Sequence, residues 1–119
     1  HRGDLADRVR WADWLSKHEA PADARHPLLG LIVSWTHSDP EGAGTWLDQA
    51  APGDLRNKAI IEHAFQLAGS DPEAAANWTL RLPEGKRRDK IQGQVLKIWK
   101  STDAGAASRF AAAHGVPMP

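Results

Sequence analysis

The sequence repeats with a constant step of 32 residues, and this period restricts the fold more than any other feature. An aspartate, followed seven residues later by an aromatic residue, recurs at every step without a gap. The aspartates are Asp7, Asp39, Asp71 and Asp103, and the aromatics are Trp14, Trp46, Trp78 and Phe110. Trp35, Leu67 and Trp99 are related by the same step. A period of about 20 to 50 residues is typical of chains that stack one supersecondary unit on the next.

Each 32-residue unit has the start and stop signals of two helices. The run Ser70-Asp71-Pro72-Glu73 provides a helix cap, a proline suited to the first turn and an acid near the positive end of the helix dipole. The aspartates are therefore predicted to be helix caps. A first helix is expected to continue to Arg81 and to end near Leu82, before Pro83. Apolar stripes predict second helices over residues 54–68 and 87–100, and over 25–35 in the first unit.

These patterns predict an all-α fold, a right-handed α-solenoid of about three and a half 32-residue helical hairpins with seven helices. The expected organisation is a single helical-repeat domain over residues 1–119. Its units span approximately residues 7–38, 39–70, 71–102 and 103–119. Because the chain begins with His1 and not with methionine, we expect it to be a piece of a longer protein.

Six tryptophans in a short chain raise the alternative of an aromatic binding site, but five of them follow the 32-residue step. A residue repeated at a fixed step is expected to pack. The predicted repeat core consists of Trp14, Trp35, Trp46, Leu67, Trp78, Trp99 and Phe110. Trp11 is the exception, because the other units have Ala43, Ala75 and Ala107 at its position. It is interpreted as a terminal cap or as part of a contact surface.

The run from Asp71 to Arg88 resembles a known class of repeat. Asp71-Pro72-Glu73-Ala74-Ala75, Trp78 and Leu82-Pro83, together with Trp35, Asp39-Pro40 and Trp46, resemble bacterial helical-hairpin repeats of the Trp…Asp-Pro-x-Ala-Ala…Trp…Leu-Pro type. These repeats belong broadly with tetratricopeptide-like and HEAT-like solenoids and have no characterised role. Gly42 departs from the pattern, and Ala104 and Gly105 replace the proline and glutamate in the last unit. The resemblance implies binding of a protein or peptide.

Composition excludes several classes of function. Fifteen basic residues balance fifteen acidic ones, so no overall charge favours nucleic acid or an anionic membrane. The absence of cysteine excludes disulfides and thiolate chemistry, but it is compatible with both cytoplasm and periplasm. The longest apolar runs are too short to span a bilayer, so no membrane insertion is expected.

The polar residues show no catalytic pattern. The histidines lack metal-ligand spacing, and no nucleophile elbow, phosphate-binding glycine loop or paired carboxylates are present. We therefore predict no catalytic residues, no metal, no cofactor and no enzymatic activity. His63 stands where other units have Leu31 and Val95, which predicts a half-buried position. Arg56 and Arg88 recur in register, which indicates structural pairing with an acid of an adjoining hairpin.

One segment departs from charge balance. Residues 82–100 have a net charge of +4, and several of their basic residues fall near one helix face. The predicted interaction surface consists of Trp11 and five of these basic residues, Lys86, Arg87, Lys90, Lys97 and Lys100. The alternative to a binding role is that these residues form an ordinary solvent-exposed face of the helix.

The sequence is compatible with three alternative hypotheses about function. The first is a non-catalytic scaffold that binds a protein or peptide. The second is binding of nucleic acid or an anionic surface through the basic face of residues 86–100. The third is a structural helical appendage of a larger envelope protein or enzyme.

Overall fold

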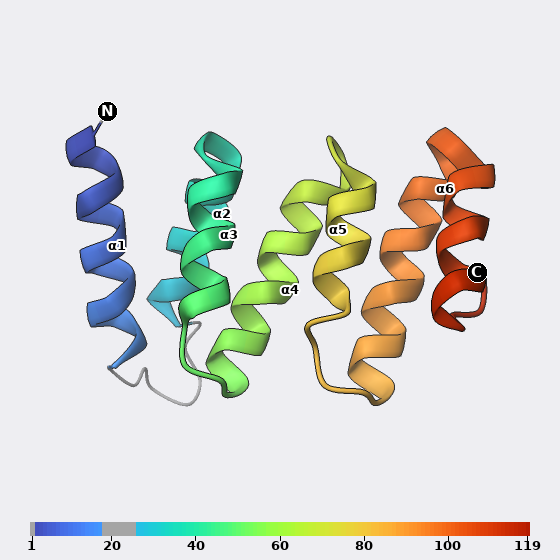
Figure 1. Ribbon diagram of the computed structural model, residues 1–119. Coiled ribbons are helices and arrows are strands. Elements are labelled where there is room, and N and C mark those ends of the chain that lie inside the picture. The colour runs from blue at the N-terminus through green and yellow to red at the C-terminus, as the bar shows by residue number, and fades with distance from the viewer. Residues whose placement is uncertain (1, 18–25) are drawn as a thin grey trace. The chain divides into compact units, whose positions relative to one another are not determined.

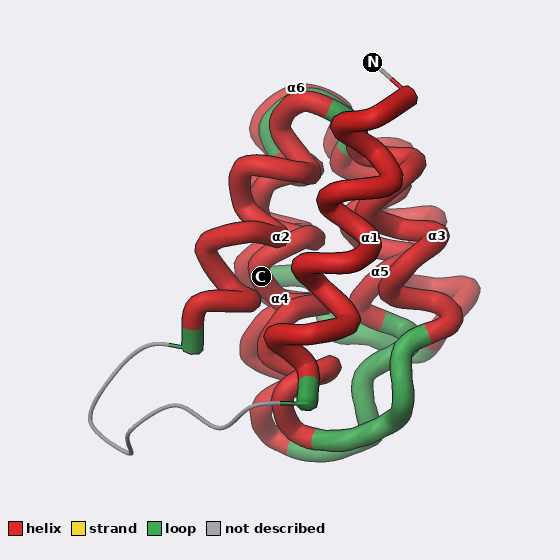
Figure 2. Tube along the Cα trace, turned by 90° about the vertical axis from the view of Figure 1, so that its left-hand side faces the viewer, coloured by secondary structure: helices red, strands yellow, loops and turns green. Residues whose placement is uncertain are grey.

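The computed structural model describes residues 2–17 and 26–119, and these residues form helices and loops only (Figures 1 and 2). The fold is therefore all-α, as predicted. Six helices are found in the described residues: α1 (Arg2–Ser16), α2 (Pro27–Ser38), α3 (Pro40–Gln49), α4 (Asp54–Ala68), α5 (Pro72–Thr79) and α6 (Lys86–His114). None of them is both long and apolar enough to cross a membrane.

Three of the repeated aspartates share one backbone conformation. The φ and ψ angles are −152° and 77° at Asp39, −144° and 74° at Asp71, and −153° and 82° at Asp103. In each case the side-chain Oδ1 accepts a hydrogen bond from the backbone N–H three residues later, at 3.0 to 3.1 Å. The predicted capping role of these three residues is confirmed.

The helix count differs from the prediction in the last unit. The predicted seventh helix is continuous with the sixth, because α6 runs from Lys86 to His114 with a kink at Asp103. Proline follows Asp39 and Asp71, but Ala104 follows Asp103. Asp103 itself is non-helical and caps the segment after it, so two helical segments meet at the kink. The helix ends at Gly115, which has the left-handed φ of 64° that glycine tolerates best.

Asp7 does not cap a helix, and this part of the prediction is wrong. It lies inside α1, where its carboxylate accepts from the Arg10 guanidinium one turn later. Arg8 occupies the position that proline has after Asp39 and Asp71, and it is compatible with a continuous helix.

Helix ends elsewhere also shift from their expected places. Helix α2 begins at Pro27, and His26 caps it by accepting the N–H of Leu28 on its ring Nδ1 at 3.1 Å. Helix α5 ends at Thr79, two residues before the predicted Arg81. The Thr79 hydroxyl donates to the carbonyl of Ala76 at 2.6 Å, within the last turn of the helix.

Two compact units make up the chain, residues 1–63 and 64–119, and the boundary falls within α4. In the first unit, α2 packs against both α1 and α3. Its core includes Leu28, Ile32, Trp35 and Leu47, all with at most 1% of their surface exposed. His63 is also buried, and Thr36 Oγ1 lies 2.7 Å from its Nδ1. The prediction of a half-buried histidine is therefore wrong, because this hydrogen bond allows complete burial.

In the second unit, α5 packs against α6. Its core includes Ala75, Val95, Leu96 and Ala107, which are fully buried. The rings of Trp99 and Phe110 lie on either side of the kink in α6, with centroids 5.8 Å apart. The kink therefore lets two parts of one helix bury their aromatic rings together.

Replacing Asp71 with alanine tests the capping role. Asp71→Ala removes the acceptor for the Ala74 N–H, so we expect the free energy of unfolding to fall by about 1 kcal/mol. Asp71→Asn keeps an acceptor oxygen and should retain most of the stability. Urea unfolding followed by circular dichroism measures both, and an equal loss in the two variants would contradict the capping role.

Candidate functional site

Most residues of the predicted repeat core are buried. No more than 9% of the surface of any of these side chains is exposed: Trp35, Trp46, Leu67, Trp78, Trp99 and Phe110. In the first unit, the rings of Trp35 and Trp46 lie 6.4 Å apart. In the second unit, the Arg81 guanidinium lies 3.9 Å from the centre of the Trp78 ring. These rings therefore act in packing.

Trp14 departs from this pattern, and its predicted place in the core is wrong. It is 52% exposed, whereas its register equivalent Trp46 is 7% exposed. Trp46 packs on Trp35 of α2 and donates its indole N–H to Asp13 of α1 at 2.7 Å. The residue 32 positions before Trp35 is Gly3, so the sequence offers Trp14 no aromatic ring at the position from which Trp35 packs on Trp46.

Trp11 and Trp14 together form an aromatic surface on α1, which we call the indole surface. Trp11 is 58% exposed, and the two rings meet edge to face with centroids 5.9 Å apart. Together with Asp7 and Arg10 they line a hollow of about 350 Å³. The hollow therefore combines apolar ring faces with an ion pair. Large exposed rings of this kind are typical of sites that contact another protein.

The predicted basic residues of α6 are all exposed: Lys86, Arg87, Lys90, Lys97 and Lys100. At about 100° per residue, the four lysines fall within an arc of about 80° around the helix. The Lys100 ammonium donates to the carbonyl of Pro119 at 3.1 Å. The structure thus brings the four lysines to one side of α6, and it places Trp11 on a different helix.

The two arginines that recur in register contact backbone carbonyls that precede their own helices. Arg56 Nε donates to the carbonyl of Leu47 at 2.8 Å, and an Arg88 terminal nitrogen donates to that of Leu82 at 3.4 Å. No acid of an adjoining hairpin takes part in these bonds, so that part of the prediction is wrong. Arg56 thus ties the start of α4 to the last turn of α3, and Arg88 ties the start of α6 to the loop after α5.

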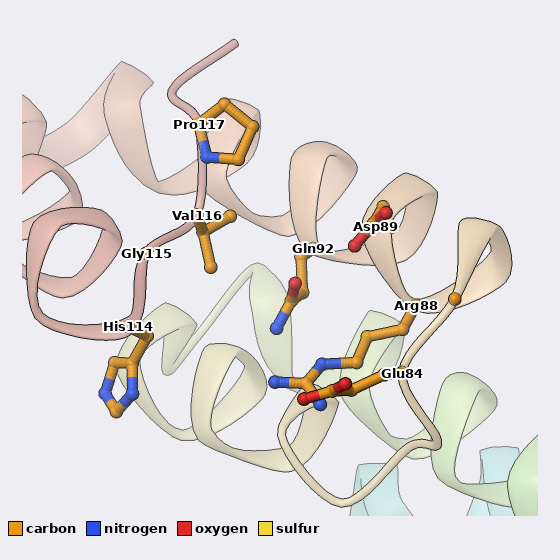
Figure 3. A pocket seen from close by; sticks show the side chains of 9 residues that line it. Glu84, Arg88, Asp89, Gln92, His114, Gly115, Val116 and Pro117 are labelled. Atoms are coloured by element: carbon orange, nitrogen blue, oxygen red, sulfur yellow. The ribbon is translucent and has the colours of Figure 1, made fainter.

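A polar pocket in the second unit was missed by the sequence analysis. It measures about 310 Å³ and lies between the start of α6 and the segment after its end (Figure 3). Its lining residues are Glu84, Gly85, Arg88, Asp89, Gln92, His114, Gly115, Val116 and Pro117. The sequence contains one signal for this pocket. Gln92 is a polar residue at the register position that the apolar Leu28 and Ile60 occupy in other units.

No metal site is found in the part of the chain that the structure describes, since no three histidine or acidic side chains gather there. Comparison with known proteins assigns no family. No family model matches the sequence, and searches of the curated proteins and of the solved structures find no match.

The contrast between Trp14 and Trp78 gives a direct test of the packing assignment. Trp78→Ala should lower the free energy of unfolding by about 3 to 5 kcal/mol, because it empties a buried site. Trp14→Ala should cost less than about 1 kcal/mol, because the ring is half exposed. Thermal and urea unfolding measure the two effects. Equal losses would contradict the different roles given to the two rings.

Proposed function

We propose that this chain is a helical-repeat scaffold, a right-handed α-solenoid of tetratricopeptide-like or HEAT-like type, that binds another protein through the indole surface of α1. The scaffold has no catalytic role of its own. The observation that carries the proposal is the exposure of Trp11 and Trp14, at 58% and 52%, in a chain whose other four tryptophans are buried.

The repeated helix junctions support the solenoid. Asp39, Asp71 and Asp103 have the same backbone angles and make the same side-chain hydrogen bond. The 32-residue step in sequence therefore corresponds to one recurring local geometry. Recurrence of this kind is what a stack of similar hairpins requires.

The surroundings of Trp46 indicate what chemistry the partner has. Trp46 is covered by α1, whose Asp13 accepts the indole N–H. Trp14 occupies the same register position on α1 itself and faces a hollow with an exposed arginine, Arg10. The matching partner is an amphipathic helix with a carboxylate, which places apolar side chains on the rings and its acid near Arg10.

The basic face of α6 supports a second candidate function, binding to nucleic acid or another polyanion. Four exposed lysines on one side of a helix can contact successive phosphates. Overall charge balance argues against strong attraction at a distance, so this function ranks second.

Site-specific crosslinking tests the protein-binding function. A photo-reactive amino acid placed at position 11 should crosslink to a partner protein, which is then purified and titrated by calorimetry. We expect Trp11→Ala combined with Trp14→Ala to weaken its affinity at least about tenfold, since exposed tryptophans are typical hot spots. The matched control is Lys90→Glu combined with Lys97→Glu, which should leave the affinity unchanged.

Two results would overturn this function. One is a purified partner that binds the double tryptophan variant as tightly as the wild type. The other is sedimentation in which the wild type self-associates and the tryptophan variant does not, since this would assign the surface to a second copy of the chain.

Fluorescence anisotropy with labelled duplex DNA separates the second candidate from the first. If the basic face binds polyanions, affinity should fall steeply with added salt and should be lost in Lys90→Glu combined with Lys97→Glu. Absence of binding at low salt, or binding that survives the charge reversal, would remove this candidate.

A further inference from the structure

Gln92 is a polar residue at a core position. The register equivalents Leu28 and Ile60 are apolar and have at most 1% of their surface exposed. Gln92 is itself only 3% exposed, and its amide nitrogen has no hydrogen-bond partner among the described residues. A buried amide N–H without an acceptor destabilises the fold, so its presence calls for a compensating contact.

The Gln92 amide points into the polar pocket of the second unit. Figure 3 shows its nitrogen directed into the space between Arg88, Val116 and His114. Arg88 adds a guanidinium to the same wall. The N-terminal turn of α6 begins there too, and its cap residue Gly85 provides no side-chain acceptor. This part of the pocket is therefore rich in hydrogen-bond donors.

Acidic groups line the same pocket. Glu84 and Asp89 are both exposed carboxylates among its lining residues. Arg88 is the one guanidinium among the lining residues. Two carboxylates and one guanidinium give the lining a formal charge that does not favour a dianion such as phosphate. A ligand that has both an anionic and a cationic group is complementary to both sets of side chains.

We propose that this pocket binds a small zwitterion of the amino-acid class. The ligand carboxylate accepts from the Gln92 amide and the Arg88 guanidinium, and the ligand ammonium is held by Glu84 and Asp89. A volume of about 310 Å³ suits a ligand of this size. The site uses only the second unit, so it is independent of the indole surface on α1.

Calorimetric titration with glycine, alanine, serine and glutamine tests the site, with acetate, methylammonium and phosphate as singly functional controls. At least one amino acid should bind saturably and at least about tenfold more tightly than any control. Absence of binding by all four amino acids up to about 10 mM would overturn the proposal. Equal affinity for acetate or phosphate would overturn it as well.

Gln92→Leu restores the apolar residue found at this register position and should not lower the melting temperature, because it removes a buried donor without an acceptor. It should weaken amino-acid binding at least about tenfold. Gln94→Leu is the matched control, since Gln94 is exposed on the same helix, and it should bind like the wild type. Unchanged binding by Gln92→Leu would overturn the proposal.

Glu84→Gln provides a second, independent variant. It removes one partner of the ligand ammonium but leaves the donors for the carboxylate in place. Amino-acid affinity should therefore fall while the weak affinity for acetate does not. A parallel loss of both affinities, or no loss of either, would contradict the assigned role of Glu84.

Discussion

The helix junction formed by a single aspartate is the constraint on which the rest of the structure depends. Only Asp39 lies between the end of α2 and the start of α3. Its N–H donates to the carbonyl of Trp35 at 2.6 Å, and its carboxylate accepts from Gly42. One residue thus closes one helix and opens the next. Asp71 does the same between α4 and α5, so the direction of each new helix is fixed locally.

This junction determines which aromatic rings meet. An aromatic residue four positions before the aspartate and another seven positions after it are brought together, as in Trp35 with Trp46 and Trp99 with Phe110. Helix α1 differs at both positions, because Asp7 is helical and the residue 32 positions before Trp35 is Gly3. Trp14 of this helix is 52% exposed. A position that is buried in other units is exposed in α1, and it forms part of the surface that we propose as a binding site.

The sequence was most informative where local signals and the repeat agreed. Proline after Asp39 and Asp71 and the apolar stripe of α4 predicted these elements well, because capping and helical periodicity act within a few residues. The α1 region departs from the repeat, because Asp7 is helical, whereas Asp103, which also lacks a following proline, keeps the cap conformation. The side chains of the polar pocket come from both ends of a 29-residue helix and its neighbouring loops, so only the folded chain brings them together.

The central claim is that the 32-residue step is a packing register, and an in-register extension tests it most directly. Residues 39–70 are inserted before Asp7 in place of residues 1–6, which sets Leu67 eleven positions before Trp14, the spacing of Trp35 and Trp46. Hydroxyl-radical footprinting read by mass spectrometry then reports the exposure of Trp14. The account predicts that its oxidation falls to the level of Trp46. Oxidation unchanged from the native chain, or lowered equally by an extension shifted by two residues, would contradict it.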